Sequence, residues 1–226
     1  MNARRTRSLL LALALLVPAG LRADDGEQVS SLFPLEVGRS WTYRLNLQVG
    51  DQTRAMEYVT RVVREEVVEG VGPCAALESR SNQKVFQTDW FRLDGNVLSN
   101  PKRQEGAGGP VTAFPSRTLL TGEALRALRR TGDGATWEWA SEDGAAKGTV
   151  TLEREERVHH PPFGSQECVV LLDRGTFQVG KSVRHQERRM WLAPGLGVLR
   201  EVMTVKKASG EVTIRTEAQL KRYDAP

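Results

Sequence analysis

The stretch Trp41-Thr42-Tyr43-Arg44-Leu45-Asn46-Leu47-Gln48-Val49 decides the fold class of this chain. Its odd-numbered residues are all apolar, and its even-numbered residues are all polar. Strict alternation with a period of two places the two sets on opposite faces of a β-strand, one buried and one exposed. The same alternation returns near the C-terminus, over residues 212–221.

The rest of the chain repeats this pattern with turn residues between the apolar runs. Asp94-Gly95, Asp143-Gly144 and Ser209-Gly210 are typical of hairpin turns. Further strands are predicted at residues 54–68, 74–80, 83–93, 135–141, 148–158, 167–173, 183–192 and 198–207. We therefore predict an all-β fold, a large curved antiparallel sheet (a half-barrel) of about ten strands, because strand twist curls a sheet of that size.

One central segment departs from the strand pattern. Residues 100–122 are rich in proline and glycine and are interpreted as a linker. A short helix is predicted at residues 123–130, with Ala124, Leu125 and Leu128 on its apolar side. Two roles stay open for this helix: a plug over one end of the sheet, or a mobile lid.

The linker separates two halves with matching motifs. Gly38-x-x-Trp41-x-Tyr43 recurs as Gly134-x-x-Trp137-x-Trp139, and Cys74-Ala-Ala-Leu77 recurs as Cys168-Val-Val-Leu171. We predict one β domain, residues 24–226, built from two duplicated meanders. Repeat 1 spans about residues 32–99, the linker and short helix span 100–133, and repeat 2 spans about 134–222.

The first 23 residues have the composition of a secretory signal peptide. Three arginines precede a short leucine-rich run, and small residues follow it, which suits cleavage after Ala19 or after Ala23. A single-pass membrane anchor is the alternative, but the run is short for a bilayer span. No cysteine lies near the cleavage region, so no lipid anchor is expected. The expected location is the periplasm or the medium, with no transmembrane segment in the mature chain.

The net charge of the mature chain argues against nucleic-acid binding. Residues 1–23 hold four of the 32 Lys and Arg residues and none of the 28 Asp and Glu residues, which leaves 28 of each. A nucleic-acid binder needs a surplus of cations to displace counterions. Pairs such as Arg188-Arg189 are therefore interpreted as solvent-exposed strand positions.

Residues 175–182 satisfy the spacing of a phosphate-binding loop, Gly175-x-x-x-x-Gly180-Lys181-Ser182. Such a loop must open a helix within a parallel α/β sheet. Here strand-like sequence follows Ser182, so we interpret the two glycines as parts of a loose hairpin, and we expect no cofactor.

Catalytic and metal-binding patterns are equally weak. His159, His160 and His185 lack the spacing of a zinc site and are interpreted as surface residues. No Gly-x-Ser-x-Gly motif is present, so we name no catalytic residue and expect that the protein is not an enzyme. Cys74 and Cys168 form either one disulfide or two buried thiols, and the sequence leaves both open.

The aromatic residues on the apolar strand faces are the remaining candidates for a site. Trp41, Tyr43 and Leu45, with Trp137 and Trp139, are predicted to line a groove beside the short helix. The same residues would otherwise fill a core, since Trp and Tyr carry much apolar area.

Two longer motifs support a family resemblance. Phe33-Pro34-Leu35-x-x-Gly38-x-x-Trp41-x-Tyr43 and Trp191-x-Ala193-Pro194-Gly195-x-Gly197-x-x-x-Glu201 resemble those of an uncharacterised family of exported, β-rich bacterial proteins. That family is similar to the LolA/LolB-like lipoprotein carriers, in which a curved sheet holds apolar ligands. The resemblance implies a non-enzymatic binding protein for lipid or another apolar ligand. An envelope assembly protein that docks another protein, and a hydrolase with an unrecognised site, are the alternatives.

Overall fold

The structure, a computed structural model, describes residues 29–226. The predicted signal peptide, residues 1–23, lies outside the described residues. The helices are α1 (Val29–Leu32) and α2 (Gly122–Thr131). The strands are β1 (Ser40–Val49), β2 (Gln52–Val68), β3 (Gly72–Ser81), β4 (Lys84–Asp94), β5 (Val97–Glu105), β6 (Val111–Ala113), β7 (Thr118–Thr121), β8 (Ala135–Ala140), β9 (Ala146–His160), β10 (Gly164–Val179), β11 (Ser182–Ala193), β12 (Gly197–Lys207) and β13 (Val212–Asp224).

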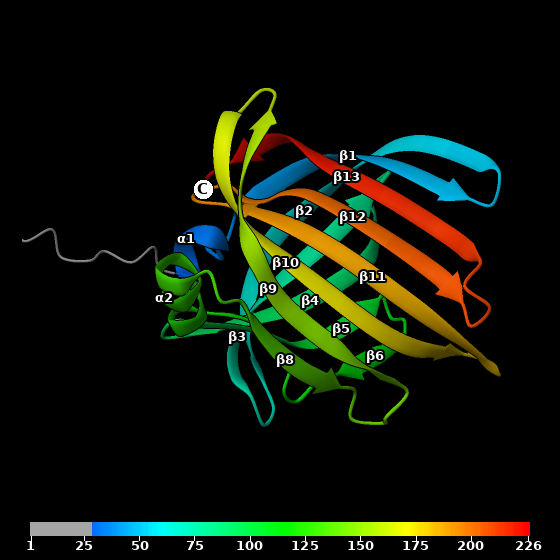
Figure 1. Cartoon of the computed structure of the whole chain (residues 1–226). Helices are drawn as coiled ribbons and strands as arrows, with labels where there is room; N and C mark the ends of the chain where they lie inside the picture. Colours follow the sequence, from blue (N-terminus) through cyan, green and yellow to red (C-terminus); the bar gives the residue numbers. More distant parts are fainter. Residues whose placement is uncertain (1–28) are drawn as a thin grey trace, which may run out of the picture.

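All thirteen strands belong to one antiparallel sheet, which confirms the predicted fold class. The order is β6-β5-β4-β3-β2-β1-β13-β12-β11-β10-β9-β8, and β7 pairs with β5 beside this path. Strands that follow one another in the chain are neighbours from β1 to β6 and from β8 to β13, and the pairing of β1 with β13 joins the halves. The long strands curl around a common interior (Figure 1). The sheet stays open, because its path ends at β6 and at β8.

The central linker was predicted wrongly. Part of β5 and the whole of β6 and β7 lie within residues 100–122. β6 and β7 have three and four residues, which is too short for alternation to be visible in the sequence. Pro101 lies inside β5, where its carbonyl accepts a hydrogen bond of 2.7 Å from the backbone N–H of Phe114. The predicted helix at 123–130 is confirmed as α2, capped by the Thr121 side chain and by Gly132 in the left-handed conformation.

The two halves share their strand order and the details of their strand pairing. Trp90 on β4 pairs opposite Lys102, and Trp191 on β11 pairs opposite Arg200, with a register shift after each tryptophan. Both cations lie over the indole ring, at 4.2 Å for Lys102 and 4.8 Å for Arg200. These are the correspondences that a duplicated meander predicts.

The hydrogen bonds of the two tryptophans match as well. The Trp90 indole donates to Glu66 at 2.5 Å, and the Trp191 indole donates to Glu156 at 3.4 Å. Each glutamate lies two strands away from its tryptophan in its own half, on β2 and on β9, with β3 and β10 between them. The pairs Arg64–Glu66 and Arg154–Glu156 repeat on the same two strands.

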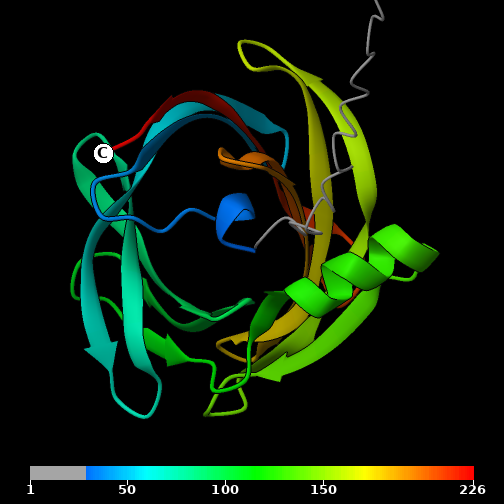
Figure 2. The same cartoon turned by 90° about the vertical axis from the view of Figure 1, so that its left-hand side faces the viewer.

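The helices take different positions on the sheet. α1 lies within the opening at one end of the curved sheet, and α2 packs outside this opening against β7 and β9 (Figure 2). Val29 and Leu32 of α1 are fully buried, and Ser31 accepts a hydrogen bond from Gly195 at 2.7 Å. The segment that plugs the sheet end is therefore α1, which the sequence did not predict.

The two open edges of the sheet meet at a seam, formed by residues 113–117 on one side and by β8 with its following turn on the other. Phe114 packs edge-on against Trp139, with ring centroids 5.6 Å apart. The backbone N–H of Glu142 donates to the Ala113 carbonyl at 3.0 Å. In the described part of the chain, the seam is therefore held by side-chain packing and by one backbone hydrogen bond, at Ala113, and not by a regular strand pairing.

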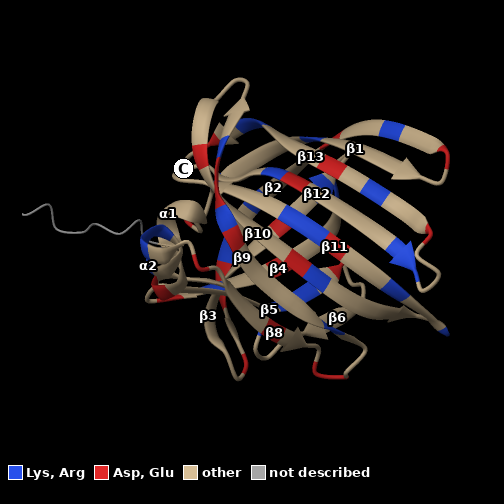
Figure 3. Ribbon diagram, in the orientation of Figure 1, with Lys and Arg blue, Asp and Glu red and all other residues tan. Residues whose placement is uncertain are grey.

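Charged residues of both signs alternate along β10 to β13 (Figure 3). Cross-strand pairs such as Arg174–Glu187 and Arg200–Glu217 form this pattern. Within residues 29–226, neither helix has the length and apolar character needed to cross a membrane.

Candidate functional site: an interior cavity

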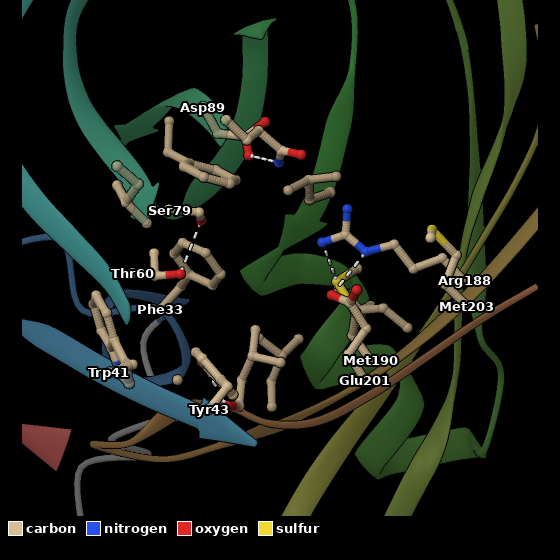
Figure 4. A pocket seen from close by; sticks show the side chains of 18 of the residues that line it. Phe33, Trp41, Tyr43, Thr60, Ser79, Asp89, Arg188, Met190, Glu201 and Met203 are labelled. Atoms are coloured by element: carbon tan, nitrogen blue, oxygen red, sulfur yellow. Dashed lines mark hydrogen bonds and ion pairs between the residues drawn. The ribbon is translucent and has the colours of Figure 1, made fainter. Parts of the chain in front are cut away.

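A cavity of about 240 Å³ lies between the two halves of the sheet. Its walls come from β1 to β5 on one side and from β10 to β13 on the other, so both halves contribute (Figure 4). Apolar side chains form most of the lining: Phe33, Pro34, Trp41, Tyr43, Leu45, Tyr58, Leu77, Phe86, Phe91, Leu98, Leu119, Leu171, Met190, Leu192, Val198 and Met203. Phe86 lines the cavity and is 43% exposed, so the cavity reaches the surface on that side.

The opposite end of the cavity is where residues 33–43 meet residues 191–201. The Trp41 indole donates to the Leu196 carbonyl at 2.6 Å, and the Tyr43 hydroxyl donates to the Val198 carbonyl at 2.9 Å. Gly197 lies under Trp41, and a β-carbon at Gly197 would stand 3.3 Å from the indole nitrogen. The motifs at residues 33–43 and 191–201 are thus the floor of one interior, although about 150 residues separate them.

Aromatic rings continue from this floor along the inner wall. Tyr43 and Tyr58 stack with centroids 5.1 Å apart, and Tyr58 meets Phe86 edge-on at 5.7 Å. Burial, and then the neighbouring Tyr58, raise the pKa of Tyr43 well above its ordinary value, so its hydroxyl stays protonated. This wall offers apolar contact with few charges.

One ion pair projects into the cavity from β11 and β12. Arg188 donates from Nε to Glu201 at 3.0 Å, and its Nη2 lies 3.0 Å from the Met190 sulfur (Figure 4). Burial alone would lower the pKa of Arg188, but Glu201, Asp173 and Asp89 outweigh it and raise that pKa above its ordinary value. Arg188 is therefore a permanent cation held inside the sheet.

A second ion pair faces the same space from β4 and β5. Arg103 donates to Asp89 at 2.7 Å, and Gln87 also donates to that carboxylate. Burial works to raise the pKa of Asp89, but Arg103 and Gln87 outweigh it, and the pKa lies below its ordinary value. Asp89 is an anion at neutral pH.

A third pair lies behind the cavity, at the seam. Arg117 and Asp173 are almost completely buried and approach to 2.5 Å. Asp173 also accepts from the Trp139 indole at 3.2 Å, and Arg117 donates to Asn100 at 3.0 Å. Burial lowers the pKa of Arg117 to about 10, although Asp173 opposes the shift. The pair fastens β10 to the far edge of the sheet.

The predicted aromatic groove is only partly assembled. Trp41, Tyr43 and Leu45 line the cavity, whereas Trp137 and Trp139 are outside its lining. Trp139 instead lines a wide hollow of about 650 Å³ at the seam, among exposed residues such as Lys147. No residue of α2 lines the cavity, so the groove is not beside that helix. β8 ends the sheet, and this position puts its tryptophans at the seam.

Of the two states that the sequence left open for the cysteines, the structure has the two free, buried thiols, Cys74 and Cys168. Cys168 belongs to the main core, whereas Cys74 belongs to a small separate cluster with Ala76 and Trp90. Burial, with Glu156 and Glu167, raises the pKa of the Cys168 thiol to about 12, and burial also raises the pKa of Cys74. Matched positions in the two repeats do not bring these sulfurs together.

The apparent phosphate-binding loop is a strand, a turn and a second strand. Gly175 lies within β10, Gly180 forms the turn, and β11 starts at Ser182. Both glycines thus belong to the β10–β11 hairpin, with Gly175 on the strand opposite Gln186 and Gly180 in the turn. A β-carbon at Gly175 would approach the Trp139 ring to 2.7 Å, so glycine leaves room for the indole.

The histidines also differ from the prediction in part. His160 ends β9 and is buried, and its Nε2 lies 2.7 Å from the Leu220 carbonyl. His159 and His185 are exposed. Within residues 29–226, no group of three or more His, Cys, Asp or Glu residues could hold a metal ion.

The charged lining was missed by the sequence analysis. Arg188 was interpreted as a solvent-exposed residue, but it points inward while Arg189 points outward to Glu153. Adjacent residues on a strand face opposite sides. The run Arg188-Arg189-Met190 therefore had to place one arginine inside, and this was the available signal.

Comparisons with known proteins support the fold. No family model and no curated protein matches the chain. A protein of Bacteroides fragilis, described as exported and as having a YmcC-like fold, is 15% identical with a TM-score of 0.51. The match covers 85% of this chain and 98% of that one. The chain shares this fold.

Two further solved structures are more distant. A Parabacteroides distasonis protein described as a lipoprotein is 11% identical, with a TM-score of 0.37, and the match covers 85% of this chain and 98% of that one. The Escherichia coli protein YmcC, described as a hypothetical lipoprotein, is 13% identical, with a TM-score of 0.33 and coverage of 80% and 86%.

Proposed function

We propose that the protein is an exported, non-enzymatic binding protein that holds a lipid or another largely apolar ligand in the interior cavity. The observation that carries this proposal is the cavity of about 240 Å³ itself, walled by aromatic and aliphatic side chains from both halves of the sheet. Small-molecule sites are concave, mostly apolar, and carry a few placed polar groups. The Arg188–Glu201 and Asp89–Arg103 pairs are such groups.

The exported location is supported by two observations. The N-terminal 23 residues have the composition of a signal peptide. The Bacteroides fragilis protein of the same fold is described as exported. An envelope location would give the cavity access to lipids.

The composition of the lining favours binding over catalysis. The hydroxyls of Thr60 and Ser79 lie 2.9 Å apart and pair with each other. Neither cysteine and no histidine is among the residues that line the cavity. Both carboxylates of the lining are held by arginines. A nucleophile next to a general base, which hydrolysis by covalent catalysis requires, is not assembled in this lining.

The proposal is tested by titrating the protein with N-phenyl-1-naphthylamine, an uncharged dye whose fluorescence rises in apolar surroundings. We expect saturable binding with one site per chain. Leu45→Glu places a charge on the inner wall and is expected to weaken binding at least tenfold, because the cavity cannot solvate it.

Val59→Glu is the matched control. Val59 lies on β2, paired opposite Thr42, is 38% exposed and does not line the cavity. The Val59→Glu variant should bind the dye with the same affinity as the wild type. Equal loss in both variants, or no saturable binding in the wild type, would overturn the proposal.

A further inference from the structure

We propose that the ligand is a single-chain amphiphile whose polar head group is uncharged, such as a glycerol ester, and that the cavity selects against free fatty acids and alkyl amines. This inference rests on the proposed function and names the class of ligand that the same cavity takes. It is carried by how the charged side chains of the lining are paired.

The charges of the lining balance. Its charged residues are Asp89, Arg103, Arg188 and Glu201, two cations and two anions, and each is paired within the lining. The third pair, behind the cavity at the seam, is also balanced. All six of these charged residues therefore have a partner, and none needs a counter-charge from the ligand.

A charged head group would add a charge that nothing in the lining balances. A fatty-acid carboxylate that reached Arg188 would lie beside Glu201, which already occupies the Nε of that guanidinium, so one cation would face two anions. An uncompensated charge in a water-poor interior is strongly unfavourable. An alkyl ammonium group faces the same problem at Asp89, which is already held by Arg103.

An uncharged head group finds hydrogen-bonding capacity at the same place. The Nη2 of Arg188 faces the thioether of Met190, a weak acceptor, and Figure 4 shows this guanidinium reaching into the cavity. A hydroxyl or ester oxygen is a better acceptor and leaves the Arg188–Glu201 pair intact. Gln87 and Gln186 in the same lining add amide groups that suit hydroxyls. The aromatic wall around Tyr43 and Tyr58 then receives the acyl chain.

The test compares three ligands with chains of equal length by isothermal titration calorimetry of the mature protein at pH 8. The ligands are 1-decanoylglycerol, decanoate and decylammonium, each below its critical micelle concentration. We expect 1-decanoylglycerol to bind at least tenfold more tightly than either ion. Decanoate or decylammonium binding as tightly as the glycerol ester would overturn the inference but leave the proposed function standing. Absence of binding by all three would overturn both.

Removing either charge of the Arg188–Glu201 pair should change the ligand preference, in opposite directions for the two residues. Glu201→Gln leaves Arg188 without its anion and is expected to improve decanoate binding at least fivefold relative to the glycerol ester. Arg188→Gln should shift the preference toward decylammonium instead. Glu217→Gln is the matched control, because Glu217 also pairs with an arginine, Arg200, but is outside the lining. Unchanged ligand ratios in both cavity variants, or the same change in the control, would contradict the inference.

Discussion

Replacing Arg117 by methionine tests whether the buried pair at the seam holds the sheet closed. The side chains of Arg117 and Asp173 are 3% and 1% exposed and lie 2.5 Å apart. Methionine keeps much of the aliphatic volume but leaves Asp173 as a buried carboxylate. Within residues 29–226, its one remaining side-chain donor is the Trp139 indole. Breaking a buried pair in this way costs about 3–5 kcal/mol. For a chain of this size, that corresponds to a fall in melting temperature of about 6–20 °C.

Arg174→Met is the matched control, at the position next to Asp173 on β10. Arg174 pairs with Glu187 at 3.0 Å, but the two side chains are 60% and 41% exposed. Such a surface pair is worth about 0–1 kcal/mol. Urea unfolding of both variants provides the measurement. Adding Asp173→Asn to Arg117→Met should recover part of the lost stability, because it removes the unpaired, buried carboxylate. If Arg117→Met unfolds at the same urea concentration as Arg174→Met, the reasoning about the seam is refuted.

Three further changes test other parts of the structure. The lowered pKa of Asp89 means that its ionised form stabilises the fold above the unfolded value of 3.8, and this stability is lost as the pH falls through the lower, folded value. Urea midpoints of Asp89→Asn should therefore change less between pH 5 and pH 2 than those of the wild type, and equal changes would contradict this assignment. Gly175→Ala should lower the melting temperature and shift the fluorescence maximum of Trp139, because the new β-carbon would stand 2.7 Å from that ring and displace it. An unchanged melting temperature and an unchanged emission spectrum would contradict this packing. In a thiol assay without reductant, Cys74 and Cys168 should react only after the protein is unfolded. If the unfolded protein has no reactive thiol, the two cysteines form a disulfide.

The fold class was predictable because it depends on a local signal. Alternation at residues 41–49 fixes which side chains of β1 face inward, and β13 carries the same signal. The matching motifs also predicted the equal strand order of the two halves, which Trp90 and Trp191 display in detail. Strands of three or four residues, such as β6 and β7, are too short to show a period.

The site was less predictable because it depends on how the sheet curls. Trp41 and Tyr43 were correctly placed in the lining, but equivalent positions in the second half are not equivalent in space. β1 is paired on both sides, whereas β8 is an edge strand, so Trp139 packs at the seam. Arg188 looked like a surface residue because charge alone suggests exposure, and its partner Glu201 lies 13 residues away on another strand.

Native mass spectrometry of the protein, purified from its own cells without detergent, tests the central claim most directly. We expect one non-covalent adduct per chain, with the mass of an uncharged single-chain amphiphile, that is released on collisional activation. The adduct should be missing from Leu45→Glu and present in Val59→Glu, purified in the same way. A wild-type spectrum that shows only the bare chain would contradict the claim that the interior cavity holds a ligand.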